Sequence, residues 1–266
     1  MKVNEVTCSS VLSDTELYGL DYSVNPYVGC AHGCTYCYAV FMKRFTGHGE
    51  EWGRFVDVKT NAPKVLRKEV QNKKVGSVLL SSVTDAYQPL EKRFEITRKV
   101  LRTLEKEGFH VSILTKNDLV LRDLDILKRF DHGRLSVGFT VNFLDEKDRK
   151  LWEPGTSDIG SRIEALEKLR KEGIPTYVHV GPWLEGITDL KKIVRAVEEN
   201  VYEIQVENLN TRRDRKIVET VEKGYPELTE VYRRTVKNKK DHNRKLQSNV
   251  ESIRKETDVP IRLYLD

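Results

Sequence analysis

The sequence lacks any hydrophobic run of the roughly 18 residues that a membrane-spanning helix needs. Its first residues, MKVNEVTCSSVLSD, lack the basic and then apolar pattern of a secretory signal. Cysteine is scarce, since the chain has four and none follows Cys37. A disulfide scaffold spreads its cysteines along the chain, so this distribution argues against one. We therefore expect a cytoplasmic protein without membrane contact, and we take it to be a monomer.

Internal repeats, low-complexity tracts and Gly/Ser linkers are also absent. Hydrophobic residues make up 38% of the 266 residues, enough to bury the core of one large domain or two small ones. Lys and Arg number 46 against 41 Asp and Glu, a formal net charge of +5. Residues 210–255 hold 14 basic and 7 acidic residues, so the rest of the chain is slightly acidic. This tail fits either a solvated helical cap or an electrostatic footprint for nucleic acid.

Short apolar runs alternate with amphipathic segments along the chain. The apolar runs predict strands at 22–28, 76–82, 110–115, 134–141, 175–180 and 202–207. The amphipathic segments predict helices at 63–71, 94–108, 119–130, 159–172 and 188–200. Such an alternation is typical of a parallel sheet covered by helices, either an open doubly wound sheet or a barrel. In both, ligands bind at the carboxyl ends of the strands.

The most unusual stretch is NPYVGCAHGCTYCYA at 25–39, which places Cys30, Cys34 and Cys37 in a C-x3-C-x2-C spacing. Three thiolates on one short loop can hold three irons of a [4Fe–4S] cube and leave the fourth iron open for a small molecule. Gly29 and Gly33 let the backbone wrap closely around such a cube. The alternative is a zinc knuckle that uses the three cysteines plus His32 or a remote ligand.

This stretch resembles the radical S-adenosylmethionine (SAM) superfamily, whose signature is this spacing with an aromatic before the third cysteine, here Tyr36. The wider string resembles the spore photoproduct lyase-like branch. Three further segments look like that branch's motifs: TDAYQPLE at 84–91 with ITR at 96–98, LTKN at 114–117 with RD at 122–123, and Glu153-Pro154 followed by Arg162. The resemblance extends over residues 20–210.

The resemblance implies a partial (β/α)6 TIM-type barrel of parallel strands with a C-terminal helical cap. We expect an N-terminal extension at 1–21, the barrel at 22–210 and a basic, mostly helical segment at 211–266. It also implies a [4Fe–4S] cluster, SAM and an external one-electron donor of flavodoxin or ferredoxin type. The reduced cluster would cleave SAM to a 5′-deoxyadenosyl radical, which abstracts hydrogen from a substrate. The basic tail favours a nucleic-acid substrate; the alternative function is a zinc-stabilised nucleic-acid-binding module.

Residues that follow the predicted strands are the expected SAM contacts: Tyr36, Ser82, Thr84, Asp85, Lys116, Thr140 and Asn142. Small hydroxyls and the Asp85 carboxylate suit the SAM ammonium, while Lys116 could neutralise the SAM carboxylate. Thr140 and Asn142 could bond the ribose or the carboxylate, and Tyr36 would present its backbone to the adenine. The expected substrate contacts are His179, Trp183, Glu185 and Glu207. Glu153 and Arg162 are expected to form a structural ion pair.

One departure from the lyase branch concerns a thiol. Spore photoproduct lyase proper carries a cysteine at the end of its second strand that returns hydrogen to the product radical. Here that place reads Ser81-Ser82-Val83-Thr84, without a thiol, and Cys8 lies before the barrel begins. Thymine-dimer repair by the known route is therefore not expected.

Overall fold

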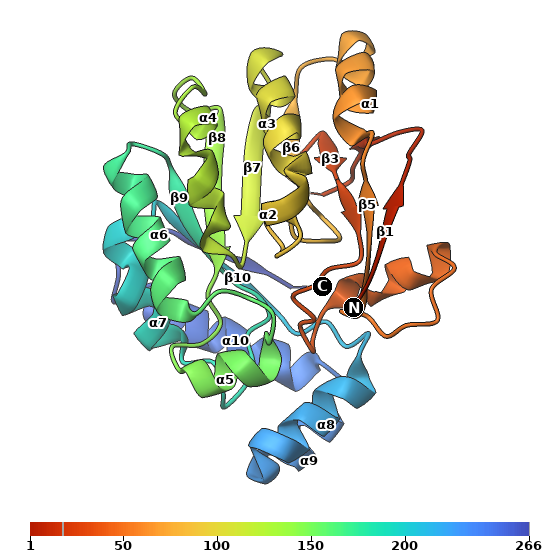
Figure 1. Ribbon diagram of the computed structural model, residues 1–266. Helices are drawn as coiled ribbons and strands as arrows, with labels where there is room; N and C mark the ends of the chain where they lie inside the picture. The colour runs from red at the N-terminus through yellow and green to blue at the C-terminus, as the bar shows by residue number, and fades with distance from the viewer. Residues whose placement is uncertain (18, 266) are drawn as a thin grey trace.

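The computed structural model describes residues 1–17 and 19–265 and contains a mostly parallel, curved sheet with helices on its outer face (Figure 1). Its eight strands lie in the order β11-β10-β9-β8-β7-β6-β3-β2. Their bounds, in that order, are Ile261–Tyr264, Glu203–Glu207, Thr176–Val180, Leu135–Thr140, His110–Thr115, Ser77–Leu80, Tyr22–Val24 and Leu12–Asp14. All neighbours pair in parallel except β2, which is antiparallel to β3. The predicted partial barrel is confirmed.

Helices alternate with the strands of both sheets, and the longer ones pack against the sheets with apolar faces. They are α1 (Ala62–Glu69), α2 (Glu91–Phe94), α3 (Ile96–Lys106), α4 (Leu124–Leu127), α5 (Glu146–Trp152), α6 (Ile159–Lys171) and α7 (Leu190–Val197). In α7, for example, Leu190, Ile193 and Val194 recur at helical spacing and are buried. Asp189 starts this helix by accepting from the Lys192 amide at 3.1 Å. Within the described residues, no helix is long and apolar enough to span a bilayer.

The predicted first strand at 22–28 is wrong as a single element. Its first part is β3, and its second part, β4 (Tyr27–Val28), belongs to a separate sheet of order β1-β5-β4. The strands β1 (Lys2–Val6) and β5 (Phe55–Lys59) complete that sheet. The break falls at Asn25-Pro26, where proline has no N–H for a ladder. The Asn25 side chain instead accepts from the Val83 amide at 3.0 Å, which ties the break to the end of β6.

Several elements were not predicted, because their apolar pattern is short or broken. They are β1 and β2 within the expected extension, β5, α5 and β11. Helix α5 buries only Arg149 and Trp152, so it shows no apolar stripe. The predicted helix at 119–130 is a 3-10 helix, η3 (Asp118–Asp123), followed by the short α4. The division into an extension, a barrel and a tail stays a prediction. Strands from the expected extension and tail are nevertheless part of the sheets: β1 belongs to the three-stranded sheet, and β2 and β11 belong to the eight-stranded sheet.

The tail is helical and packs through its sparse apolar residues. It contains α8 (Asp214–Gly224), the 3-10 helix η5 (Pro226–Leu228), α9 (Thr229–Thr235) and α10 (Lys240–Ile253). Short 3-10 helices elsewhere in the chain include η2 (Val70–Asn72) and η4 (Glu198–Asn200). Ile217, Val221 and Tyr232 are fully buried with Trp152 of α5. Many of its charges pair with one another, as Arg233 does with Glu222 and Glu230.

Candidate functional site

The cysteine loop follows β4 and is largely enclosed. Cys30 and Cys34 are buried and Cys37 is partly exposed, and all are free thiols. Burial raises the pKa of the Cys30 thiol, and the nearby Asp85, Cys34 and Cys37 raise it further. Three thiols that oppose one another's ionisation fit a site where metal cations neutralise thiolate charge. Among the described residues, no group of three or more His, Cys, Asp and Glu side chains is arranged to hold a single metal ion.

Backbone contacts hold this loop closely. Gly29 has a φ of +85°, and a Cβ there would lie 2.5 Å from the carbonyl oxygen of Phe55 in β5. A Cβ on Gly155 would lie 2.4 Å from the Ala31 carbonyl oxygen. The Gly155 amide also donates to the His32 carbonyl at 2.9 Å. Side chains at these glycines would displace the loop, which packs tightly against β5 and the segment after α5. The predicted wrapping of Gly29 and Gly33 around a cluster stays a prediction.

The segment after β6 clasps the loop, and we call Thr84, Asp85 and Gln88 the clasp. The Thr84 hydroxyl donates to the Gly29 carbonyl at 2.6 Å. The Gln88 amide accepts from the Ala31 N–H at 2.9 Å and donates to the same Gly29 carbonyl at 3.4 Å. The TDAYQPLE segment therefore fixes the backbone between the cysteines, a role that its sequence pattern did not predict.

Asp85 joins the clasp to the next strand. Its carboxylate lies 3.3 Å from His32 Nδ1 and accepts from the Thr115 hydroxyl at 2.7 Å and the Lys116 amide at 3.0 Å. Burial raises the pKa of Asp85, but His32, Thr115 and Lys116 outweigh burial and hold it at about 2. The ionised carboxylate is thus already engaged by protein groups, and its contact with the SAM ammonium stays a prediction.

On the inner side of the loop lies a fully buried polar cluster, here called the Glu153 network: Tyr36, Asn142, Glu153 and Arg162. Glu153 and Arg162 form the expected ion pair at 2.7 Å. Glu153 also accepts from the Tyr36 hydroxyl and from the Asn142 amide. The Asn142 side chain further bonds both backbone groups of Gly181, at 2.8 and 3.2 Å. These bonds lock the Tyr36 ring and occupy the Asn142 amide, whose SAM contact stays a prediction.

Buried polar atoms without a hydrogen-bond partner among the described residues include Ser81 Oγ and Thr140 Oγ1 at strand ends and His32 Nε2 in the cysteine loop. Ser81 has a left-handed φ of +75°, an unusual conformation for serine, while Ser82 accepts from Asn25 at 3.0 Å. Burial lowers the pKa of Lys116, but the nearby Cys34, Glu153 and Asp85 outweigh it, so Lys116 stays a cation. A cation directly after β7, at the carboxyl edge of the sheet, suits a carboxylate-bearing ligand.

The expected substrate residues fall into two places. His179 Nε2 and Glu207 Oε2 are 3.1 Å apart at the ends of β9 and β10. Burial raises the pKa of Glu207, but His179 and Lys116 lower it overall, so this pair faces the same interior as Lys116. Trp183 instead packs on His242 of α10, with ring centroids 5.0 Å apart. Glu185 pairs with Lys245 of the same helix at 2.5 Å.

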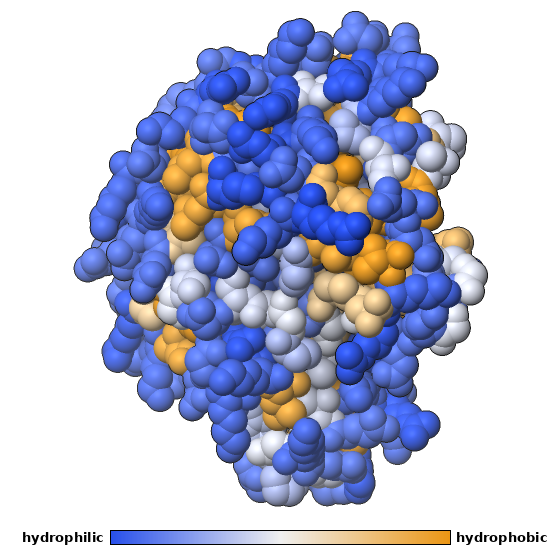
Figure 2. All heavy atoms as spheres, in the orientation of Figure 1, coloured by the Kyte–Doolittle hydropathy of each residue, from blue (hydrophilic) through white to orange (hydrophobic). Residues whose placement is uncertain are grey.

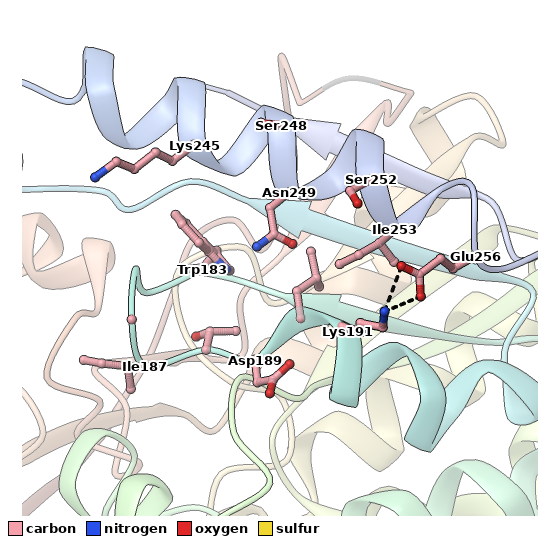
Figure 3. A pocket seen from close by; sticks show the side chains of 13 residues that line it. Trp183, Ile187, Asp189, Lys191, Lys245, Ser248, Asn249, Ser252, Ile253 and Glu256 are labelled. Carbon is pink, nitrogen blue, oxygen red and sulfur yellow. Dashed lines mark hydrogen bonds and ion pairs between the residues drawn. The ribbon is translucent and has the colours of Figure 1, made fainter.

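Figure 3 shows the cavity that Trp183 borders, about 720 Å³ in volume, between the start of α7 and α10. The ion pair Lys191–Glu256, at 2.5 Å, lies at one end of it. Its lining includes none of the cysteines and neither His179 nor Glu207. Trp183 and Glu185 therefore lie by this outer cavity rather than beside the cysteine loop.

Arg213 is a residue that sequence reasoning missed. Its guanidinium donates to the Cys34 carbonyl at 3.2 Å, although it belongs to the expected tail. The neighbouring Arg212 lies over the Phe41 ring, 5.1 Å from its centroid. The pair of adjacent arginines directly after the sixth predicted strand was the available signal, because residues there reach the carboxyl edge of the sheet.

A second buried cluster, the Glu91 network, consists of Glu91, Arg98, Arg122 and Asp123. Arg122 pairs with both carboxylates at 2.8 Å, and Arg98 pairs with Asp123 at 2.7 Å. Both carboxylates are fully buried. The four residues of this network come from the segments that resemble family motifs. Glu91 ends TDAYQPLE, Arg98 ends ITR, and Arg122 and Asp123 are the RD pair. The network is linked to the start of the cysteine loop through Tyr27, whose hydroxyl bonds Glu91. It is linked to the clasp through Tyr87, whose hydroxyl donates to Asp123 at 3.2 Å and whose amide donates to Asp85 at 2.8 Å.

Known proteins resemble this chain along most of its length. The family model of the radical SAM superfamily matches residues 24–198. An uncharacterized protein of Methanocaldococcus jannaschii is 33% identical over 263 residues, which cover 98% of this chain and 96% of that protein. Spore photoproduct lyase of Bacillus subtilis is 26% identical over 242 residues, which cover 83% of this chain and 66% of the lyase.

A solved structure also matches. A double mutant of spore photoproduct lyase, with bound AdoMet and dinucleoside spore photoproduct, aligns with a TM-score of 0.68 at 16% identity. The alignment covers 99% of this chain and 82% of that one. At 16% identity this similarity shows that the two proteins share a fold, and the shared fold agrees with the partial barrel described above.

Proposed function

This chain belongs to the radical SAM superfamily of enzymes, and from that premise we propose that it cleaves SAM reductively and abstracts hydrogen from a substrate. When bound, a [4Fe–4S] cluster and SAM supply a one-electron cleavage that yields methionine and a 5′-deoxyadenosyl radical. The observation that carries the proposal is the enclosed trio of free thiols on a clasped loop. The family favours this enzyme over the zinc-stabilised binding module.

The chain's own residues have distinct parts in this proposal. Cys30, Cys34 and Cys37 hold the cluster, and the Lys116 ammonium pairs with the SAM carboxylate. The expected contacts Ser82 and Thr140 lie at the ends of predicted strands, and within the described part of the chain the hydroxyls of Ser81 and Thr140 have no hydrogen-bond partner.

Four other residues act first by positioning. The contacts described above hold the cysteine loop in position, and they come from Tyr36, Thr84, Asp85 and Asn142. The backbone of Tyr36 would also line the binding site for the adenine of SAM. Tyr36, Asp85 and Asn142 are buried and keep water from the loop, which protects a reactive radical.

The decisive experiment compares cysteine variants after anaerobic reconstitution. We expect the wild-type chain to bind about four iron and four sulfide and to release 5′-deoxyadenosine with dithionite and SAM. The triple variant Cys30→Ala/Cys34→Ala/Cys37→Ala should lose the cluster and the cleavage, whereas Cys8→Ala, the matched control, should keep both. Unchanged cleavage in the triple variant, or tight zinc in a colourless wild-type protein, would overturn the assignment.

We further propose a nucleic-acid substrate, with His179 and Glu207 as contacts near the reacting atoms. Two observations support it: the similarity to a lyase solved with a dinucleoside, and the basic tail. Trp183 and Glu185 would contact more distant parts of the substrate. The cytoplasmic location and the monomeric state stay predictions.

The tail gives a test with an internal control. Lys239 of the tail lowers the pKa of Glu207, one of the proposed substrate contacts, and that of His242. Lys237→Gln/Lys239→Gln/Lys240→Gln should weaken binding of labelled single-stranded RNA or DNA at least tenfold and reduce its salt dependence. Arg233→Gln, which removes an arginine already paired with two glutamates, should not. Equal binding by both variants would remove the tail as a substrate surface.

A further inference from the structure

A 3-10 helix covers the outer side of the cysteine loop. This helix, η1 (Tyr38–Phe45), begins at the residue after Cys37. Its Ala39, Val40 and Met42 pack in one cluster with Cys30 and Cys37. The opposite side of η1 faces solvent, with Tyr38 41% and Phe45 66% exposed.

Basic side chains interleave with these exposed aromatics. The Arg44 guanidinium lies 4.6 Å from the Phe45 ring centroid and 5.6 Å from that of Phe41. Arg212 lies over the other part of the Phe41 ring, at 5.1 Å. We call Tyr38, Phe41, Arg44, Phe45 and Arg212 the η1 patch. In Figure 2, hydrophobic atoms gather on the right, over the region where Figure 1 draws β1, β5 and the orange segment after the cysteine loop.

The composition of the η1 patch is that of a contact surface. Aromatic residues and arginine are enriched in protein interfaces, and rings held under guanidinium groups present apolar area and positive charge together. Such a surface complements a partner that is acidic and has an apolar centre.

We propose that the η1 patch docks an acidic one-electron donor protein of the flavodoxin or ferredoxin class, an inference that rests on the proposed function. One electron leaves the reduced flavin or iron–sulfur group of the donor, which is oxidised. The cluster held by the three cysteines gains that electron and is reduced, and no atom crosses the interface. The electron is then used in cleavage of the S–C5′ bond of SAM.

The position of the patch favours this partner over a nucleic acid. Tyr38 follows a predicted cluster ligand directly, and η1 packs on two of the three thiols, so a donor there is separated from the cluster by one layer of residues. Arg213, beside Arg212, bonds the carbonyl of Cys34. A substrate must instead reach the strand ends, where His179, Glu207 and Lys116 lie.

The test compares charge reversals on the reconstituted holoprotein. In Arg44→Glu/Arg212→Glu, we expect the Kd for an acidic flavodoxin, measured by calorimetry at low salt, to rise at least tenfold. The apparent KM for flavodoxin in SAM cleavage should rise similarly, while dithionite-driven cleavage stays within twofold of wild type. Phe45→Ala should weaken binding severalfold without a charge change. The control is Arg244→Glu/Lys171→Glu, two side chains about 80% exposed elsewhere, which should leave the Kd unchanged.

Each outcome decides the proposal. Equal flavodoxin Kd values for the patch variant and the control would overturn it. So would a patch variant that binds flavodoxin normally but loses labelled RNA or DNA, which would make the patch a nucleic-acid surface. If the wild type gives no dithionite-driven cleavage, the proposed function fails, and the binding measurement still reports on the patch separately.

Discussion

The two buried ionic networks of this protein are alike in chemistry and different in position. Each holds a fully buried glutamate paired with arginine at 2.7–2.8 Å, and each is built from segments that resemble family motifs. The Glu153 network contains Tyr36 of the cysteine loop and bonds the end of β9 at Gly181. The Glu91 network joins α2, α3 and η3 and reaches the cysteine loop indirectly, through Tyr27 and through Tyr87, which also bonds Asp85. A motif match therefore identifies a required side chain without saying whether it serves the site or the scaffold.

The largest effect that we predict is a loss of folding stability, and we expect it when either network loses its glutamate. Glu153→Gln leaves the fully buried Arg162 without its carboxylate, which should destabilise the fold by about 3–5 kcal/mol. Glu91→Gln removes one of the two carboxylates that pair with the partly exposed Arg122, so its loss should be smaller but above about 1 kcal/mol. Urea unfolding monitored by circular dichroism measures this loss. Glu164→Gln, an exposed change on α6, is the control and should have little effect. A loss below about 1 kcal/mol in either buried variant would contradict the view that these pairs hold the fold.

Glu153→Gln and Glu91→Gln should differ in SAM binding and in the properties of the cluster, although both lower the stability of the fold. Glu153→Gln weakens the acceptor of Tyr36 and Asn142, so we expect at least a tenfold rise in the Kd for SAM and a changed electron paramagnetic resonance signal of the reduced cluster. Glu91→Gln should keep both near wild type when assayed below its unfolding temperature. The reverse pattern would exchange the roles assigned to the networks.

His242 contrasts with both networks, because it is buried and its nearest carboxylate, that of Glu185, lies 3.9 Å away. Burial holds its pKa at about 4, below the usual 6.5. As the pH falls through 6.5, the unfolded chain binds a proton that the folded chain does not bind until about 4, so stability is lost with falling pH. The loss between pH 7 and 5 should be about 2 kcal/mol. Urea unfolding should show His242→Phe with a correspondingly flatter pH dependence, and His132→Gln, at an exposed site, with none of this change.

The weakest effect concerns single hydroxyls beside each network. Thr84 donates to Gly29 in the loop at 2.6 Å, and Thr97 donates to Ala86 in the scaffold at 2.6 Å. Thr84→Val and Thr97→Val should each cost about 1 kcal/mol in thermal stability. Only Thr84→Val should hasten cluster loss to a chelator, followed by visible absorbance, and Thr84→Ser should restore the wild-type rate. Equal rates in all variants would mean that the clasp does not retain the cluster.

The sequence predicted the parallel core well because each of its strands buries a continuous or an alternating set of apolar residues. Runs such as 110–115 and 175–180 are close to their true bounds, and the six predicted strands are the central six of the sheet. The prediction failed where apolar residues are few, as in β1, α5 and β11. The site was harder, because a family motif names residues but not their partners. Asp85 and Asn142 were read as ligand contacts, and only the folded structure reveals that neighbouring protein groups already bond both side chains.

The pairing of β11 with β10 has a consequence for synthesis. Residues 261–264 pair with residues 204–207, so the strand that ends in Glu207 has an open edge until residues more than fifty positions later have left the ribosome. At a translation rate of roughly 5–20 residues per second, that edge is unpaired for several seconds and offers a template for aggregation. A truncated chain that stops near residue 255 would keep this edge permanently, and low yield of such a truncation would be explained by it rather than by any defect in the cysteine loop.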